Sequence, residues 1–342
     1  MLRFIKRLVK QKAFPLLIIL IVMMIFTMVY SSGVLKGAPI SDMFSKGFMS
    51  RTNWVTNFYN LVIQIMMMTG LSCILISGNF DMSISSQATL GSLIFAIVLK
   101  QPWSSWWSTI LITIAVTLVF GLINTFLVNE VKLPAFIATI GISSVYTGLC
   151  NVVSGGDNVQ ISDPRLVAFG AKTFGPVPLM FIIAIVILII VEYILFKTKF
   201  GRSLYMSGSN PAAARLCGLN PMKMRTVLFC VNSTLAVFGG VFWTCQTKMA
   251  SPTSIISSAP NMTATSAAVL GGVSFFGGTG ELVGPLIAVF LVNIFENMLN
   301  ILHVSEYYVI ILQGVLLIVS LIIDYFGVKR REAANIAAAM AK

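Results

Sequence analysis

The feature that most limits how this chain can fold is a series of long apolar runs separated by short polar breaks. About 20 apolar residues in a helix are needed to cross the hydrocarbon core of a membrane. Ten runs approach that length, and they cover residues 13–34, 54–77, 84–100, 107–128, 134–154, 178–196, 226–248, 263–276, 284–302 and 307–326. The eighth run is short and flanked by glycine. We therefore expect a broken or re-entrant helix there, which is tolerated only where neighbouring protein buries it.

The composition agrees with a membrane location. Hydrophobic residues make up 57% of the chain and charged residues 10%, with a mean hydropathy of +0.92, whereas soluble chains average about 45–50% and about 25%. The sequence predicts an all-α polytopic membrane protein with about ten transmembrane helices. Its parts are a basic segment at 1–12, a transmembrane domain at 13–328 and a tail at 329–342. The first apolar run is too long for the apolar core of a signal peptide and lacks an obvious small-residue cleavage site, so we expect it to be the first transmembrane helix.

The distribution of basic residues predicts the orientation. Ten crossings place both termini on one side, and that side carries 16 of the 23 Lys and Arg residues. Loops on the cytoplasmic side of a membrane are enriched in these residues. We therefore expect both termini to be cytoplasmic. A nucleic-acid partner is not expected, because no aromatic–basic patch or zinc-ligand spacing accompanies the charge.

One polar segment, residues 197–225, differs from its apolar surroundings. It reads KTKFGRSLYMSGSNPAAARLCGLNPMKMR and contains six Lys or Arg and no acidic residue. Inside it, Asn210 is a typical N-cap, Pro211 suits the first position of a helix, and Gly218 suits a left-handed residue at the helix end. Pro221 prevents the helix from continuing. The sequence predicts a short helix with both ends marked.

This short helix has two interpretations. Helices of fewer than about 12–15 residues are marginal in water, so something must pack on it. The segment could be a basic loop attracted to anionic lipid, or it could be a docking helix for a cytosolic partner. Lipid attraction requires charge but no defined fold, so the marked ends favour docking.

At this segment the chain resembles a known family. Residues 198–225 are similar to the cytoplasmic coupling loop of ribose-type permeases of ATP-binding-cassette (ABC) importers. Three further stretches resemble that family in the same order along the chain. They are SGNFDMSISS (77–86), GLINTFLVNEVKLPAFIATIGISSVYTGL (121–149) and LGGVSFFGGTGELVGPLIAVFLVNIFENMLNIL (270–302).

The resemblance implies a type II importer-like fold and a permease subunit in a bacterial plasma (inner) membrane. Such a subunit forms the path for a small pentose- or hexose-like sugar, which an extracytoplasmic binding protein delivers. A second permease copy or a paralogue, membrane lipid and ABC ATPase subunits holding ATP and Mg²⁺ would be its partners, and this chain itself would need no cofactor. The residues implied in coupling to the ATPase are Asn210, Pro211, Ala213, Arg215, Leu216 and Gly218.

Polar residues in the ninth run lie at helical spacing. Asn293, Glu296, Asn297 and Asn300 follow the pattern i, i+3, i+4 and i+7, so they share one face of a helix. Amide groups donate and accept hydrogen bonds, which suits a path for a hydroxyl-rich solute. The alternative is that these side chains bond neighbouring helices. The spacing alone supports both interpretations.

Single polar and aromatic residues in other runs are further candidates for the path. We include Asn124, Asn232 and Phe136, although interhelical packing explains each of them at least as well. The same packing role applies to Gln64, Gln313, Phe229 and Trp243.

The stretch SGNFDMSISS interrupts two apolar runs. A charged Asp81 facing lipid at the centre of a helix would cost about 2.5–3.5 kcal/mol. We expect Gly78 and Asp81 to form a structural turn in which Asp81 bonds backbone amides or caps the helix starting near Ser83.

Catalysis by this chain is not expected. The chain has no GxxxxGK[ST] phosphate loop, no GxSxG motif, one histidine and no CxxC pair among five cysteines, so neither an ATPase site nor a metal site is predicted. A nucleoside-transporting ABC permease is the alternative within the family. An ion-coupled secondary transporter is less expected, since such proteins keep ionisable groups at the midplane and only Glu192 and Glu296 lie within the runs, with Asp324 at the end of one.

Overall fold

The structure, a computed structural model, describes residues 13–32, 39 and 47–340 of the chain. The predicted basic segment 1–12 and the last two residues of the predicted tail lie outside them. The helices in chain order are α2 (Ala13–Ser31), α3 (Arg51–Ile76), α4 (Ile84–Leu99), α5 (Trp106–Asn129), α6 (Ala135–Ser154), α7 (Pro164–Ala171), α8 (Leu179–Lys197), α9 (Lys199–Ser209), α10 (Pro211–Leu216), α11 (Pro221–Thr247), α12 (Ser254–Ser257), α13 (Pro260–Leu270), α14 (Val283–Ile301) and α15 (Glu306–Met340). The other elements are η3 (Gly47–Met49), β1 (Val159–Gln160), β2 (Thr173–Phe174), β3 (Val177–Pro178) and β4 (Met249–Ala250).

The predicted class, an all-α polytopic membrane protein, is confirmed. Within the described residues, seven helices are long and apolar enough to cross a membrane: α3, α5, α6, α8, α11, α14 and the part of α15 at Tyr307–Phe326. Two shorter apolar helices, α2 and α4, match the first and third predicted spans. The eighth predicted span is the short helix α13, which ends at Leu270. α15 continues as one helix past residue 328, where the tail was expected to begin.

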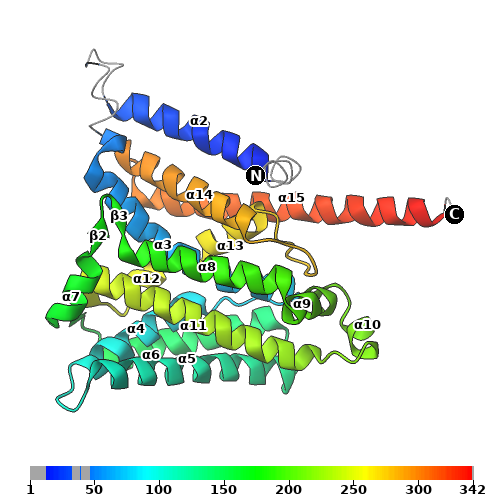
Figure 1. The fold of residues 1–342 in the computed structure, drawn as a ribbon, viewed down its shortest axis with the longest axis horizontal. Helices are drawn as coiled ribbons and strands as arrows, with labels where there is room; N and C mark the ends of the chain where they lie inside the picture. The colour runs from blue at the N-terminus through cyan, green and yellow to red at the C-terminus, as the bar shows by residue number, and fades with distance from the viewer. Residues whose placement is uncertain (1–12, 33–38, 40–46, 341–342) are drawn as a thin grey trace.

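The helices form a bundle with two distinct ends (Figure 1). Helices α2, α14 and α15 lie on one side of the bundle, and α5 and α6 lie on the other, with α3, α8, α11 and α13 between them. Helices α9 and α10 occupy the end that we call the α10 end. Helix α7 and the strands occupy the opposite end, which we call the α7 end. There β1 pairs with β4 and β2 pairs with β3, both antiparallel.

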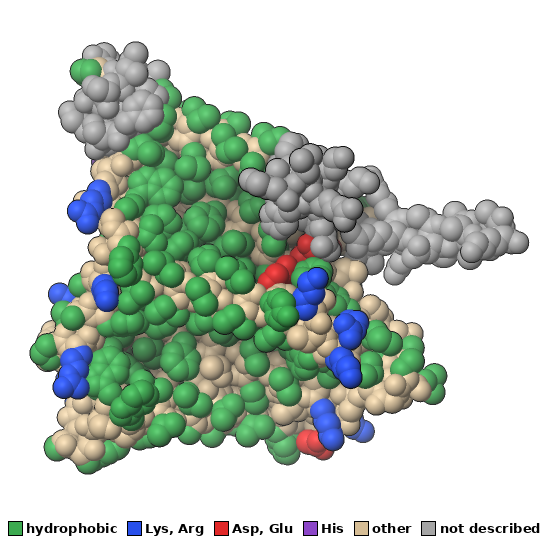
Figure 2. Space-filling model, in the orientation of Figure 1, with side chains coloured by type: hydrophobic (Ala, Val, Ile, Leu, Met, Phe, Trp, Pro, Cys, Tyr) green, Lys and Arg blue, Asp and Glu red, His purple; other side chains and the backbone are tan. Residues whose placement is uncertain are grey.

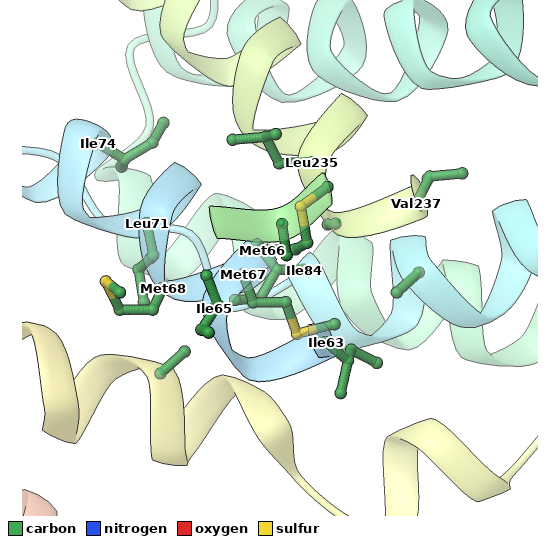
Figure 3. Close-up of a cluster of buried hydrophobic side chains, with 14 of the residues drawn as sticks. Ile63, Ile65, Met66, Met67, Met68, Leu71, Ile74, Ile84, Leu235 and Val237 are labelled. Atoms are coloured by element: carbon green, nitrogen blue, oxygen red, sulfur yellow. The ribbon is translucent and has the colours of Figure 1, made fainter. Parts of the chain in front are cut away.

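Helix α3 is the centre of the bundle. Every residue from Leu61 to Ile76 is buried, as expected for a helix that is apolar on all faces. It packs against α8, α11, α13 and α14. Figure 3 shows part of this core, where Met66 and Met67 of α3 lie near Ile84 of α4 and Leu235 of α11.

The outer surface has the distribution expected of a protein in a bilayer. Hydrophobic side chains cover the middle of the visible face, while Lys and Arg gather at its two ends (Figure 2). Large apolar residues such as Leu111 of α5, Ile189 of α8 and Ile318 of α15 are exposed. With no water in the bilayer core, these helices satisfy their backbone groups internally and present side chains to lipid.

Two loops connect successive helices in the interior of the bundle. Residues 77–83 connect α3 to α4, and residues 271–282 connect α13 to α14. The first loop turns at Gly78, whose φ of +72° favours glycine over residues with a side chain. The N-terminus of α13 approaches the N-terminus of α4, where the backbone N–H of Asn261 in α13 donates to Oγ of Ser85 in α4 at 3.3 Å.

Candidate functional site

The short helix α10 is defined by its caps. The side chain of Asn210 accepts hydrogen bonds from the backbone N–H groups of Ala212 (3.1 Å) and Ala213 (3.0 Å), which satisfies two donors that a helix start leaves free. Pro211 occupies the first helical position. The chain leaves the helix through Gly218, whose φ is +77°. Local chemistry alone therefore accounts for the position of this helix.

One face of α10 is free. Ala214 is buried, whereas the side chain of Leu216 is 91% exposed. Ala213 and Arg215 are exposed as well. An apolar leucine held in solvent on a capped helix is a surface available to a partner. All six residues implied in coupling lie on or beside α10.

Helix α9 joins α10 to the two interior loops through a contact that we call the glycine junction, formed by Gly78, Gly208, Gly277 and Gly278. A Cβ on Gly208 would collide with the backbone oxygen of Ile76 and with the N atom of Gly278, at 2.9 Å from the latter. The N–H of Gly278 donates to that same Ile76 oxygen at 2.8 Å. The backbone of helix α9 is therefore in direct contact with the backbones of the loops 77–83 and 271–282.

Tyr205 strengthens this contact. Its hydroxyl donates to the backbone oxygen of Gly280 at 2.7 Å. Burial raises the pKa of the Tyr205 hydroxyl, so it remains a donor at neutral pH. The sequence pattern did not mark Tyr205 or Gly208, because their partners lie far away along the chain.

Two carboxylates fix the loop 271–282 to neighbouring helices. Oδ2 of Asp324 in α15 accepts from the backbone N–H of Phe275 (2.9 Å) and from Oγ of Ser274 (3.3 Å). Oε2 of Glu192 in α8 accepts from the N–H of Leu282 at 3.0 Å. These two acidic residues, which the sequence left as candidates for ion coupling, bond to loop backbone.

A buried polar cluster surrounds Asp81 in the loop 77–83. Its Oδ1 accepts from the backbone N–H (2.8 Å) and from Oγ (2.5 Å) of Ser83. Its Oδ2 accepts from the side-chain amides of Asn124 in α5 (3.2 Å) and Asn232 in α11 (2.9 Å). Asn124 and Asn232 are fully buried. The cluster thus bonds the turn to two helices.

A second polar group surrounds Glu296 of α14. Its Oε1 accepts from the side-chain amide of Gln313 in α15 (2.8 Å) and from the hydroxyl of Thr263 in α13 (3.3 Å). Its Oε2 accepts from the amide of Gln64 in α3 at 3.4 Å. Four helices therefore meet at one carboxylate, and all of its hydrogen-bond donors are neutral groups.

Beside Glu296 lies a cavity of about 270 Å³, which we call the Glu296 pocket. Its polar lining includes Asn60, Gln64, Glu296, Asn300 and Gln313, and Trp243 provides an aromatic wall. Glu296 and Asn300 lie in the last two turns of α14, and Gln313 lies near the start of α15. The pocket is therefore in the half of the bundle nearer the α7 end.

The four residues of the predicted polar face of α14 have different surroundings in the structure. Glu296 and Asn300 line the pocket. Asn297 pairs with Asn53 of α3, and Asn293 is buried with its Oδ1 lacking a partner. Phe136 lies elsewhere, with its ring 5.9 Å from that of Phe80.

The pairing of Asn297 leads to a prediction about its role. Nδ2 of each asparagine donates to Oδ1 of the other, at 3.1 Å and 2.8 Å. Interhelical hydrogen bonds in membrane proteins contribute about 0.6–2 kcal/mol. We expect Asn297→Ala to lower protein abundance and uptake in parallel, and Asn53→Ala to do the same. Immunoblots and uptake assays measure both quantities, and Asn300→Ala is the control expected to leave abundance unchanged. Uptake lost at normal abundance would instead place Asn297 in the path.

The sequence did not indicate that three of the pocket residues lie together. Gln64, Gln313 and Trp243 were each interpreted as packing residues, since a single polar or aromatic residue in an apolar run gives no spacing to interpret. The structure brings them together from three helices. Among the described residues, no group of three or more His, Cys, Asp or Glu could hold a metal ion.

Apolar helices, an exposed capped helix at one end and an interior polar pocket together define a membrane transport protein. Residues 52–321 match the family model described as the permease component of branched-chain amino acid transport systems, and the chain belongs to that family of ABC transport permeases. It is similar to the ribose import permease RbsC of Haemophilus influenzae, with 28% identity over 94% of this chain and 95% of that protein. It is also similar to the L-arabinose transport permease AraH of Escherichia coli, with 28% identity over 78% of this chain and 80% of that protein.

A third relative, the autoinducer 2 import permease LsrC of Salmonella choleraesuis, is 26% identical over 78% of this chain and 76% of its own length. No solved structure shows a significant match.

Proposed function

We propose that this chain forms the membrane path of an ABC importer for a small sugar, with α10 as its contact to the ATPase. The observation that carries this proposal is α10 itself. This six-residue helix is capped at both ends and buries Ala214 against the chain, yet it holds Leu216 91% exposed. A groove on a partner subunit explains this exposure, because helix-in-groove docking buries such apolar residues.

The sugar follows from the relatives and from the pocket. Two relatives are named for ribose and for L-arabinose. The Glu296 pocket of about 270 Å³ is smaller than the roughly 300–1,000 Å³ typical of drug-sized ligands, so it suits a single small ring. Its amide, hydroxyl and carboxylate groups suit a solute rich in hydroxyls.

The orientation follows from charge. The segment 197–225, at the α10 end, contains six basic residues and no acidic one, which supports a cytosolic location of this end in a bacterial cell. The α7 end then faces outward, where an external binding protein delivers the solute. ATP and Mg²⁺ are held by the partner ATPase, and a second permease copy or a paralogue completes the path.

Reconstitution tests this function. The permease is purified with its partner ATPase and binding protein and is placed in liposomes. We expect uptake of radiolabelled ribose or arabinose that requires ATP and binding protein and that an uncoupler leaves unchanged. Uptake by the permease alone, or uptake abolished by an uncoupler and indifferent to ATP, would contradict the proposal.

A further inference from the structure

A hollow of about 320 Å³, which we call the Arg165 hollow, lies where the start of α5 meets α7. Trp106, Trp107 and Ile110 of α5 line it together with Arg165 of α7. Helix α7 and the start of α5 are both at the α7 end of the bundle (Figure 1). The described lining is therefore aromatic and aliphatic, with one guanidinium group.

The Arg165 hollow lies at the edge of the membrane. Helix α5 is long and apolar enough to cross the bilayer, so its first turn lies near the boundary between headgroups and acyl chains. Trp107 is 77% exposed, and Trp103, in the loop before α5, is 64% exposed. Tryptophan is enriched at this boundary because its ring is apolar with a polar edge. These indoles therefore indicate that the hollow lies at the level of the lipid headgroups.

The side chain of Arg165 is available to a ligand. It is exposed, and among the described residues its guanidinium has no hydrogen bond or ion pair. Its backbone N–H donates to Oδ1 of Asp163 at 2.8 Å, and this cap fixes the start of α7. A guanidinium presents five N–H donors in a planar fork, which binds phosphate through two parallel hydrogen bonds. Arg165 therefore offers a phosphate site within the headgroup layer.

An apolar face of α5, which we call the α5 track, leads from the hollow toward the bilayer centre. It consists of Ile110, Ile114 and Leu118, whose i, i+4, i+8 spacing places them on one side of the helix. Ile114 and Leu118 are exposed. Eight residues of helix span about 12 Å, and half of the hydrocarbon core is about 15 Å thick. A lipid with its phosphate at Arg165 can therefore lay one acyl chain along this track.

We propose that the Arg165 hollow and the α5 track bind one phospholipid with an anionic headgroup, from the leaflet at the α7 end. Arg165 holds the phosphate, Trp106 and Trp107 flank the glycerol region, and the α5 track contacts an acyl chain. The occupant is lipid because the hollow adjoins the exposed apolar face of α5, which the bilayer covers. An anionic headgroup is preferred because Arg165 is the only charged residue among the described residues that line the hollow.

A competition between two lipids tests this site. The purified permease–ATPase complex is mixed in mild detergent with equal amounts of phosphatidylglycerol and phosphatidylcholine that have the same acyl chains. Native mass spectrometry then reports which lipid the complex retains and how many permease chains it contains. We expect phosphatidylglycerol to be retained about fivefold more, the factor expected for one basic residue near an anionic lipid. Equal retention of the two lipids, or retention of neither, would overturn the proposal.

A pair of variants assigns the preference to the hollow. Arg165→Ala removes the guanidinium and should lower retention of phosphatidylglycerol toward that of phosphatidylcholine. Lys172→Ala is the matched control, because Lys172 is an exposed basic residue at the same end that does not line the hollow, and it should behave as wild type. An unchanged preference in Arg165→Ala, or an equal loss in both variants, would reject the site. A changed number of permease chains in Arg165→Ala would show an interface between copies instead.

A second pair tests the α5 track. Ile114→Trp fills the middle of the track and should lower retention of phosphatidylglycerol several-fold, since the acyl chain loses its place on the helix. Leu111→Trp makes a similar change on a residue of α5 that is exposed but lies outside the track, and it should leave retention unchanged. Wild-type retention in Ile114→Trp, or the same loss in Leu111→Trp, would overturn the acyl-chain contact.

Discussion

We expect Leu216→Asp to abolish binding of the ATPase subunit while the permease still inserts normally in the membrane. Leu216 is 91% exposed, so its removal costs the isolated chain little, as for most surface substitutions. In a docked complex the same position is buried against the partner, where an unpaired carboxylate is strongly disfavoured. If Leu216 is a hot spot at the centre of the interface, its contribution is about 2 kcal/mol or more, which corresponds to roughly a thirtyfold loss of affinity.

The measurement is co-purification of the ATPase with a tagged permease. Ala213→Glu is a second variant on the same helix, and it should have the same effect because Ala213 is also exposed. The matched control is Phe174→Asp, since Phe174 is 55% exposed in β2 at the α7 end. Normal recovery of the ATPase with both α10 variants would remove α10 from the interface.

The sequence allowed α10 and the apolar helices to be predicted for the same reason. The length of each apolar run determines a membrane span, and the capping residues determine where α10 begins and ends. Both signals lie within a short stretch of sequence. Asn210, Pro211 and Gly218 act on backbone groups within a few residues of themselves. The short eighth span was also visible, because glycine flanks an apolar run too short to cross.

The interior polar sites could be predicted only in part. The turn at Asp81 was recognisable, but its bonds to Asn124 and Asn232 depend on how α5 and α11 pack. The i, i+3, i+4, i+7 spacing of α14 placed four residues on one face, yet neighbouring helices decide what each of them meets. Glu296 meets Gln64, Thr263 and Gln313, whereas Asn297, one residue further, meets Asn53. Spacing within one helix contains no information about the adjacent helix.

The glycine junction shows the same limit and has a mechanical consequence. Helix α9 is joined to α10 by the single extended residue Asn210, and its Gly208 lies against both loops that lead into α4 and α14. If the ATPase moves α10, as we propose, the movement would reach both loops through these close backbone contacts of α9. Bonds from Tyr205 to Gly280 and from Gly278 to Ile76 keep the three segments together.

Gly208→Ala should consequently separate ATP hydrolysis from uptake. Alanine favours helix over glycine by about 1 kcal/mol, so helix propensity alone predicts a more stable α9. The added Cβ would instead collide with backbone atoms of Ile76 and Gly278, which move only if the junction opens. Overpacking of this kind costs about 1–3 kcal/mol. We expect the ATPase to remain bound, because α10 is unaltered, while uptake per ATP falls several-fold and thermal stability decreases.

Gly141→Ala is the matched control for this substitution. Gly141 lies in α6, and a Cβ there would meet no atom within 4 Å, so the exchange should be neutral or slightly stabilising. Uptake, ATP hydrolysis and thermal unfolding are measured on both variants in the same reconstituted importer. Wild-type coupling in Gly208→Ala would mean that motion of α10 reaches the bundle by another contact, such as α11, which follows α10 in the chain, or α8, which packs against α9.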